Sequence, residues 1–293
     1  MSAPLRVWLE ATRPKTLSAS IAPVAIGTAI AYGANGFHAL ACVAALLGAL
    51  GVQVACNLAN DYFDGKKGAD GPQRVGPRRA VASGLIPGQT MLRAAIAVLL
   101  VIVLPCATYL ALRAGWPFLA LGGVAALLAV VYTGGPFSLA YLGLGDLFAF
   151  IFFGPVAVAA TYAAQTTQWS WTPALAGLGP GFLACAILTI NNLRDEESDR
   201  LAHKRTLAVR FGASFARAEF VTCAVAAALV AVGLAAWYRH WSLLIAVIAV
   251  LTLLPSIRRV LAGETGSPLN GVLASTGRAL FLYGILFSIG WIR

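Results

Sequence analysis

Long apolar runs limit the possible folds of this chain more than any other feature. Hydrophobic residues make up 59% of the sequence, and only 11% of its residues are charged. The runs lie at residues 16–34, 38–60, 91–112, 116–134, 146–166, 172–192, 213–236, 241–257 and 270–291. A helix of about 20 apolar residues crosses a bilayer, whereas barrel strands would alternate in polarity. We therefore predict an all-α, polytopic membrane protein with nine transmembrane helices in a bundle around a central cavity.

Prolines inside three of the runs predict where the bundle opens. Pro155, Pro180 and Pro255 interrupt the fifth, sixth and eighth runs. A proline inside a helix removes a backbone hydrogen bond and often kinks the helix. We therefore expect these three helices to bend, which would help to form the cavity.

The charges predict which helix ends face the cytoplasm. With the N-terminus inside, only Arg113, Arg239 and Arg293 lie outside, and Arg278 lies near the start of the ninth run. This asymmetry follows the positive-inside rule. The net charge of +10 is therefore a topology signal and indicates no nucleic-acid partner. All eleven acidic residues also lie in or beside the inner loops, so the chemistry is expected on the cytoplasmic side.

We expect a single domain over residues 1–293. Its first eight runs form two similar four-helix units, about 1–144 and 145–260, each with a polar motif after its second run. The ninth run belongs to neither unit. The N-terminus lacks the pattern of a cleaved signal, so the first run is expected to be retained. The five cysteines are scattered singly and predict neither disulfides nor a metal site.

The first polar motif, at residues 57–79, has the sequence NLANDYFDGKKGADGPQRVGPRR. Asn57 and Asp61 are spaced i, i+4, and Asp61 and Asp64 i, i+3, so a continuing helix places all three on one face. Carboxylate and amide oxygens suit Mg²⁺, which also binds substrate phosphates. Basic side chains that could bind phosphate follow, and these are Lys66, Arg74, Arg78 and Arg79. A polar loop that only sets topology is the alternative explanation.

The second polar motif, at residues 191–210, has the sequence NNLRDEESDRLAHKRTLAVR. Asp195 and Asp199 are spaced i, i+4, and Asn192 lies one turn earlier. The basic candidates that follow are Lys204 and Arg205. Two faces with asparagine and aspartate, each followed by lysine and arginine, are hard to explain by topology alone. The repetition favours a shared binding site.

A third segment, at residues 132–146, joins the fourth and fifth runs with the sequence YTGGPFSLAYLGLGD. Tyr132 and Tyr141 are candidates for stacking on an aromatic substrate, although tyrosines are also common at membrane interfaces. Asp146 opens the fifth run, where a carboxylate near a helix N-terminus is stabilised in any case. These three residues are therefore candidates for an acceptor pocket, with interfacial anchors and a helix cap as the alternatives.

Two acidic faces with basic residues at one end of a lipid-embedded bundle suit a diphosphate substrate with an apolar tail. Mg²⁺ bridging carboxylates and diphosphate, together with lysine and arginine, would stabilise the leaving group. A CDP-alcohol phosphotransferase is disfavoured. The signature of that enzyme class begins with DxxDG, which Asp61 to Gly65 match, but the residues after Gly65 do not match the rest of the signature. A transporter is disfavoured because the polar groups cluster at one face instead of the midplane.

Five segments resemble the UbiA superfamily of intramembrane prenyltransferases, and more closely the 1,4-dihydroxy-2-naphthoate polyprenyltransferases of menaquinone biosynthesis. They are RPKTLSASIAPVAIG at 13–27, NLANDYFDGKKGAD at 57–70, RVGPRRAVASGLI at 74–86, YTGGPFSLAYLGLGDLFAFIFFG at 132–154 and NNLRDEESDRLAHKRTLAVRFG at 191–212. The resemblance spans most of the chain. It implies nine helices, two Asp-rich motifs, and a multi-pass location in the bacterial cytoplasmic (inner) membrane.

The resemblance also implies a reaction, in which a polyprenyl group moves from polyprenyl diphosphate to 1,4-dihydroxy-2-naphthoate. The acceptor would lose its carboxylate as CO₂, giving demethylmenaquinone. Another aromatic acceptor, such as 4-hydroxybenzoate, is the alternative. Membrane lipid is the implied surrounding, whereas prenyl chain length and oligomeric state have no signal in the sequence.

The implied site combines a metal, a diphosphate and an acceptor. Its Mg²⁺ ligands would be Asn57, Asp61, Asp64, Asn192, Asp195 and Asp199, with the four aspartates as the catalytic residues. The diphosphate would be bound by Lys66, Arg74, Arg78, Lys204 and Arg205. The acceptor pocket would contain Tyr132, Tyr141 and Asp146.

Overall fold

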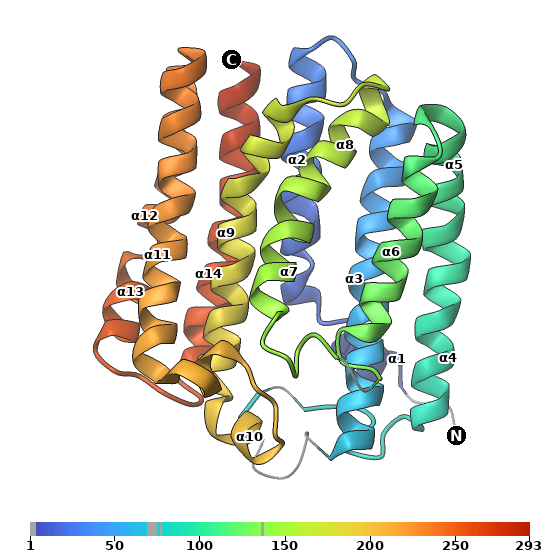
Figure 1. Cartoon of the computed structure of the whole chain (residues 1–293), viewed down its shortest axis with the longest axis vertical. Helices are drawn as coiled ribbons and strands as arrows, with labels where there is room; N and C mark the ends of the chain where they lie inside the picture. The colour runs from blue at the N-terminus through green and yellow to red at the C-terminus, as the bar shows by residue number, and fades with distance from the viewer. Residues whose placement is uncertain (1–3, 69–74, 77, 136–137) are drawn as a thin grey trace.

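The computed structural model describes residues 4–68, 75, 76, 78–135 and 138–293, and the regular structure of these residues is entirely helical (Figure 1). The long helices stand side by side in one elongated bundle. The N-terminus and the short helix α10 lie at one end of the bundle, and the C-terminus lies at the other. The all-α prediction is therefore confirmed for the described residues.

The first part of the chain contributes two helical hairpins and a short lead-in. Its elements are α1 (Leu5–Ala11), the 3₁₀-turn η1 (Pro14–Thr16), α2 (Ser18–Gly33), α3 (Ala39–Lys67), α4 (Gly88–Val98), the π-helical stretch η2 (Leu99–Val103), α5 (Leu104–Ala114) and α6 (Pro117–Val131). The elements α4, η2 and α5 follow one another without a break and form one long rod.

The second part of the chain continues the bundle. Its elements are α7 (Gly145–Ile151), the π-helical stretch η3 (Phe152–Val156), α8 (Ala157–Thr166), α9 (Trp171–Arg194), α10 (Glu196–Leu201), α11 (Leu207–Tyr238), the 3₁₀-turn η4 (Trp241–Leu244), α12 (Ile245–Leu251), α13 (Leu254–Leu261) and α14 (Leu269–Ile292). A bend of 43° separates α12 from α13, directly before Pro255, and η3 contains Pro155. Pro180 lies inside α9 without ending it.

The nine predicted runs all fall in these helices, but the helices differ in length. Six helical segments of the described chain are long and apolar enough to cross a membrane, or seven if the bent pair is one span. The apolar helices α2 and α6 are shorter, with 16 and 15 residues. Nine crossings, a cytoplasmic N-terminus and the division into two four-helix units therefore stay predictions.

Exposed tryptophans mark the end of the bundle that lies away from α10. Trp116, Trp169, Trp171, Trp237 and Trp241 are each more than half exposed, and all lie where helices turn at this end. Tryptophan is enriched at membrane interfaces because its ring is apolar and its N–H is polar. The two polar motifs lie at the opposite end, where α3 and α9 finish.

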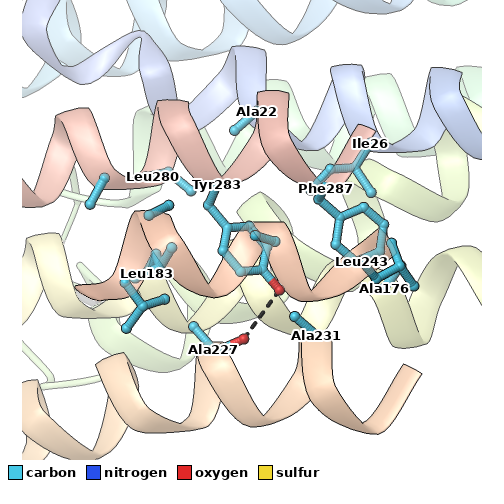
Figure 2. Close-up of a cluster of buried hydrophobic side chains, with 14 of the residues drawn as sticks. Ala22, Ile26, Ala176, Leu183, Ala227, Ala231, Leu243, Leu280, Tyr283 and Phe287 are labelled. Carbon is cyan, nitrogen blue, oxygen red and sulfur yellow. Dashed lines mark hydrogen bonds between the residues drawn. The ribbon is translucent and has the colours of Figure 1, made fainter. Parts of the chain in front are cut away.

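Small residues hold the centre of the bundle together. In Figure 2, Tyr283 and Phe287 of α14 lie among alanines and leucines of α2, α9 and α11. The Tyr283 hydroxyl donates a hydrogen bond of 3.1 Å to the carbonyl of Ala227, so the one buried polar atom of this side chain is satisfied. A Cβ added to Gly284 would lie 2.7 Å from the Cβ of Ala22. Such close approach between helices is typical of small residues in membranes, and it makes α2 and α14 neighbours.

Local signals end the helices that carry the polar motifs. The helix α3 stops at Gly68, whose φ of 71° is the left-handed conformation that favours glycine. After α10, His203 also has a positive φ of 56° and turns the chain back toward the bundle. Thr206 then begins α11, because its hydroxyl accepts a hydrogen bond from the amide of Val209. These turns bring both motifs to the same end of the bundle.

Candidate active site

A cavity of about 250 Å³ opens at the end of the bundle where the polar motifs meet, and we call it the polar cavity. Its polar lining consists of Arg13, Thr16, Gln53, Cys56, Asn57, Asn60, Asp64, Arg79, Tyr132, Thr133, Asp146, Asn191, Asn192, Lys204 and Thr206. Its deeper wall is apolar and includes side chains of α6, α7 and α9. The cavity therefore offers a charged end and a hydrophobic depth.

Asp64 is the carboxylate of the first motif that faces the polar cavity. It is buried near the C-terminus of α3. Tyr141 donates its hydroxyl to Asp64 Oδ1 at 3.3 Å, and the Arg79 guanidinium lies 3.8 Å from Oδ2. Asn60, one turn earlier on α3, accepts a short hydrogen bond from the Thr133 hydroxyl. The side chains of Asn60 and Asp64 are thus held in place by Thr133 and Tyr141, which belong to the segment before α7.

Asp61 lies on α3 at the predicted spacing from Asn57 and Asp64, but its carboxylate binds the backbone of a later segment. Its two carboxylate oxygens accept hydrogen bonds from the backbone amides of Ala80 and Val81, both at 3.1 Å. Asp61 is not among the residues that line the polar cavity, whereas Asn57 and Asp64 are. The Asp61 carboxylate therefore fixes the turn that follows Arg79.

We expect Asp61→Asn to destabilise the protein by about 1–3 kcal/mol, because one buried amide loses its acceptor. Denaturation of the purified protein in detergent would measure this loss. Glu197→Gln is the control, because Glu197 is exposed, and its stability should change little. Loss of activity in Asp61→Asn with unchanged stability would instead place Asp61 among the groups that contact substrate.

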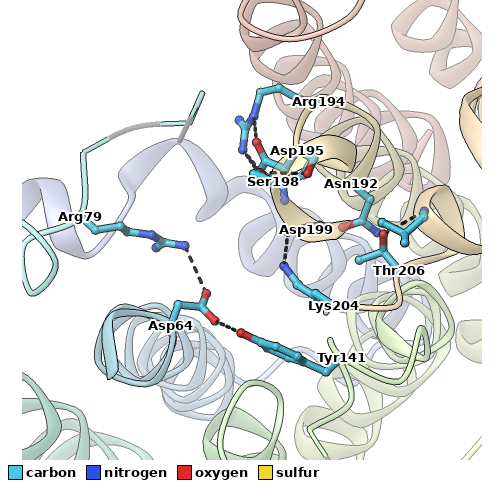
Figure 3. A network of polar contacts seen from close by, with 12 residues as sticks. Asp64, Arg79, Tyr141, Asn192, Arg194, Asp195, Ser198, Asp199, Lys204 and Thr206 are labelled. Carbon is cyan, nitrogen blue, oxygen red and sulfur yellow. Dashed lines mark hydrogen bonds and ion pairs between the residues drawn. The ribbon is translucent and has the colours of Figure 1, made fainter. Parts of the chain in front are cut away.

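Asp195 of the second motif is bound by its own neighbour. The Arg194 guanidinium donates to both carboxylate oxygens, at 2.8 and 2.6 Å (Figure 3). Arg194 also donates to Asn191 and to Asn270 of α14, each at 2.9 Å. Arginine suits this task because its planar fork matches a carboxylate. The pair therefore fastens the end of α9 to α14.

Asp199 is buried, and one of its carboxylate oxygens has no hydrogen-bond partner. Its Oδ1 lies 3.4 Å from the ammonium of Lys204, while Oδ2 is without a partner in the described chain. Burial raises the pKa of Asp199 to about 6, although the nearby Lys204 opposes this. A buried carboxylate oxygen without a partner is costly, so it suits a bound cation.

Lys204 connects the two motifs. Figure 3 shows its ammonium between Asp64 and Asp199. Burial alone would lower the pKa of Lys204, but the carboxylates of Asp199, Asp64 and Asp195 outweigh it and raise the pKa above the ordinary value. Lys204 is therefore a firmly charged cation on the wall of the polar cavity.

The three acceptor-pocket candidates lie close to these groups. Tyr132 and Asp146 line the polar cavity. Asn192 donates its amide to both oxygens of Asp146, at 3.4 and 3.3 Å. Tyr141 does not line the cavity, but its hydroxyl binds Asp64 and its ring lies 4.0 Å from the ammonium of Lys67. The segment before α7 therefore contacts both motifs.

The other predicted diphosphate contacts lie elsewhere. Lys66, Arg78 and Arg205 are exposed and are not part of the cavity lining. Arg74 lies outside the described residues. The lining instead includes Arg79, which the sequence indicated, and Arg13, which precedes the first apolar run.

Asn60 and Thr133 were not predicted as site residues. The position of Asn60, i, i+4 before Asp64, was a usable signal. No comparable signal marked Thr133, because its contact with Asn60 joins segments far apart in the sequence.

The donor set fits a hard divalent cation. Asp64, Asp199, Asn60 and Asn192 supply carboxylate and amide oxygens, which Mg²⁺ prefers. The buried Asp199 oxygen without a partner is the observation that supports a cation there. A cluster of Asp146, Cys185 and Glu219 also brings three potential ligand atoms within 4.8 Å of one another. The thiol of Cys185 makes this cluster less suited to Mg²⁺ than a set of carboxylate and amide oxygens.

Together, the fold and site are those of a polytopic membrane enzyme with an acidic and basic site at one end of its bundle. The chain belongs to the UbiA prenyltransferase family, which matches residues 20–287. This confirms the resemblance noted in the sequence.

Curated relatives align with almost the whole chain. It is 36% identical to 1,4-dihydroxy-2-naphthoate octaprenyltransferase from Haemophilus influenzae, over 98% of this chain and 96% of that protein. The enzyme of the same name from Escherichia coli is also 36% identical, over 97% and 94%. The 2-carboxy-1,4-naphthoquinone phytyltransferase from Synechocystis is 31% identical, over 87% and 82%.

Solved structures share the fold at low sequence identity. A UbiA homolog from Archaeoglobus fulgidus bound to GPP and Mg²⁺ aligns with a TM-score of 0.62 and 19% identity, over 98% of this chain and 99% of that chain. The apo structure of a UbiA homolog from Aeropyrum pernix aligns with a TM-score of 0.65 and 15% identity, over 92% and 96%. The helical architecture is therefore that of the family.

Proposed function

We propose that this protein transfers a polyprenyl group from polyprenyl diphosphate to 1,4-dihydroxy-2-naphthoate, with loss of CO₂, in menaquinone synthesis. The observation that carries the proposal is the position of Lys204. It lines the partly apolar polar cavity together with Asp64, and it pairs with Asp199, which is not itself a lining residue. The names of the curated relatives support the acceptor and the prenyl transfer.

The charged end of the polar cavity would bind the diphosphate. Lys204, Arg79 and Arg13 line it and would contact diphosphate oxygens. Asp64, Asp199, Asn60 and Asn192 would hold Mg²⁺. The Archaeoglobus homolog bound to GPP and Mg²⁺ supports a divalent cation in this family's fold. When bound, Mg²⁺ supplies positive charge that stabilises the diphosphate as a leaving group. Asp61 and Asp195 support this site indirectly, through the turn after Arg79 and through Arg194.

The chemistry follows from the substrates. The allylic C–O bond breaks, and its electron pair leaves with the diphosphate, which Lys204 and Arg79 stabilise. The ring carbon that carries the carboxylate attacks the allylic cation, and the C–CO₂ bond then breaks and returns its electron pair to the ring. Both ring hydroxyls remain, so the immediate product is the quinol form of demethylmenaquinone, and oxidation gives the quinone.

The acceptor would lie against the loop before α7. Asp146 is buried and lines the cavity, and its carboxylate is suited to accept a hydrogen bond from a ring hydroxyl. Tyr132 offers an aromatic face nearby. The apolar wall of the cavity would keep water away from the allylic cation.

The protein would work as a multi-pass enzyme of a bacterial cytoplasmic membrane. With the bent pair of α12 and α13 as one span, the shorter helices α2 and α6 would then complete nine crossings, with the N-terminus and the active site on the cytoplasmic side. The basic residues at the site end support this orientation through the positive-inside rule. The exposed tryptophans would mark the opposite interface.

An assay of the purified protein in lipid tests the function. With 1,4-dihydroxy-2-naphthoate, octaprenyl diphosphate and Mg²⁺, we expect demethylmenaquinol, and EDTA should remove the activity because the carboxylates then lack their cation. Excess Mg²⁺ added after EDTA should restore product formation, which controls for damage by the chelator. Prenylation of 4-hydroxybenzoate alone would overturn the acceptor, and transfer to neither acceptor would overturn the function.

A further inference from the structure

A short segment joins α6 to α7 at the end of the bundle where the polar motifs meet, and we call residues 132–144 the bridging segment. Residues 136 and 137 lie outside the described part of it. The second motif binds its backbone, because the Arg205 amide donates to the carbonyl of Tyr141 at 3.1 Å. The Arg210 guanidinium likewise donates to the carbonyl of Leu142 at 2.8 Å. The bridging segment is therefore attached to the second motif through its main chain.

Lys67, the last residue of α3, binds the bridging segment from the other side. Its ammonium donates to the carbonyl of Thr133 at 2.7 Å and to the Ser138 hydroxyl at 3.4 Å. It also lies 4.0 Å from the centre of the Tyr141 ring, a distance at which the face of an aromatic ring attracts a cation. An ammonium has three N–H donors and accepts no hydrogen bond. One side chain thus joins three residues of the bridging segment to the first motif.

Two of these three residues also bind the proposed metal ligands of α3. The Thr133 hydroxyl donates to Asn60. The Tyr141 hydroxyl donates to Asp64 at 3.3 Å (Figure 3). Groups that bind a metal ligand from behind fix its orientation, and their loss typically lowers metal affinity or activity about 10- to 100-fold. Lys67 holds both of these groups, so it is linked to two metal ligands through one intervening residue each.

The preceding lysine lacks these contacts. Lys66 is exposed and has no hydrogen bond or ion pair with the described residues. Successive residues of an α-helix point about 100° apart, so only one of two adjacent lysines can face the bridging segment. Both lysines lie in the last turn of α3, where a cation complements the partial negative charge of the helix end. The two residues therefore differ in their contacts and not in their effect on the helix.

We propose that Lys67 is a positioning residue, which holds the bridging segment against α3 and thereby keeps Asn60 and Asp64 oriented for a divalent cation. This inference rests on the metal site of the proposed function. It assigns Lys67 no direct contact with substrate, since Lys67 lies outside the lining of the polar cavity. Because Tyr132 belongs to the bridging segment, Lys67 also joins the proposed acceptor pocket to the metal ligands.

The test compares Lys67→Met with Lys66→Met, which makes the same change one residue earlier. Mn²⁺ is the probe, because carboxylate and carbonyl oxygens suit it as they suit Mg²⁺, and its electron paramagnetic resonance signal reports binding without turnover. With inorganic pyrophosphate present, we expect Lys67→Met to raise the Kd for Mn²⁺ about tenfold. Lys66→Met should stay within about twofold of wild type. The Mg²⁺ concentration that gives half-maximal prenyl transfer should rise in parallel with the Kd.

Two further variants separate positioning from other roles of Lys67. Lys67→Arg should restore most of the Mn²⁺ affinity, since a guanidinium keeps the charge, the N–H donors and the attraction to an aromatic ring. In a protein with both Thr133→Val and Tyr141→Phe, neither of these side chains has a hydroxyl to donate to Asn60 or Asp64. Adding Lys67→Met to that protein should change the Kd less than about twofold, because residues of one network do not act additively.

An unchanged Kd in Lys67→Met, equal rises in the two lysine variants, or a full tenfold rise in the triple variant would overturn the proposal. Lys67→Gln keeps an N–H donor for the Thr133 carbonyl and replaces Lys67→Met if that variant fails to fold. It should raise the Kd more than Lys66→Gln does. If the wild-type protein binds Mn²⁺ but transfers no prenyl group, the proposed function fails, and the Mn²⁺ affinities still decide for or against Lys67.

Discussion

Replacing Asp199 with asparagine is expected to reduce kcat for prenyl transfer at least about 1,000-fold, the scale of losing one main electrostatic contact in an active site. The buried Asp199 oxygen without a partner is the group best placed to bind a cation. An asparagine amide keeps the shape but brings an N–H group and no charge. The ion pair between Asp199 Oδ1 and the Lys204 ammonium is also lost, so a decrease in stability is expected beside the loss of activity. Steady-state kinetics with both substrates, together with denaturation in detergent, would measure the two effects.

Glu197 provides the matched control for Asp199. It lies on the same short helix α10 but is exposed. Glu197→Gln makes the same chemical change two residues away and should leave kcat within about twofold of wild type, as surface changes usually do. A kcat of Asp199→Asn within tenfold of wild type, at saturating Mg²⁺, would remove Asp199 from the proposed metal ligands.

Replacing Lys204 with methionine should be nearly as damaging, with a loss of kcat/KM for polyprenyl diphosphate of about 100- to 1,000-fold. Methionine keeps much of the length of the side chain but not its charge. The carboxylates of Asp64, Asp195 and Asp199 would then repel one another and the diphosphate without compensation. Kinetics at varied donor concentration would separate the expected rise in KM from the fall in kcat.

Arg205 is the neighbouring cation and the natural control for Lys204. The sequence places both in the same basic cluster, but Arg205 is exposed and does not line the polar cavity. Arg205→Met should therefore lower kcat/KM by less than about threefold, as expected for an exposed charge. Similar losses in the two variants would mean that the diphosphate lies outside the polar cavity.

The difference between Lys204 and Arg205 shows what sequence order cannot predict. Both residues closely follow Asp195 and Asp199 in the sequence, so both are candidates for binding the diphosphate. The left-handed turn at His203 sends the chain back toward the bundle, and the Lys204 amide then bonds the carbonyl of Asp199. The directions of the Lys204 and Arg205 side chains thus depend on the positive φ angle of His203, which is not a glycine.

The first motif shows the same limit for carboxylates. Helix spacing correctly predicted that α3 continues through Asp64, since α3 runs to Lys67. It also placed Asp61 on the face shared with Asn57 and Asp64. The backbone amides that bind Asp61 come from Ala80 and Val81, beyond a loop. Spacing within one helix contains no information about donors that a later segment provides.

The hydrophobic pattern predicted the fold more fully than it predicted the site. Every apolar run lies in the helical segments observed, because a chain in lipid must satisfy its backbone hydrogen bonds internally. The runs did not predict the π-helical stretches or the shortness of α2 and α6. Those features depend on packing between helices, as the contact of Gly154 with Gly177 illustrates.

The neighbouring positions of α2 and α14 have a consequence for biosynthesis. The ribosome makes α14 after the other described helices, yet α14 packs against α2 and supplies Asn270 to the guanidinium of Arg194. While α14 is still being synthesised, α2 has its contacts with α3, α8 and α9 but lacks those with α14, and the anchor of the second motif is incomplete. The nascent chain therefore cannot acquire a finished site before α14 has been made, and a messenger truncated before the codons of α14 encodes an inactive protein.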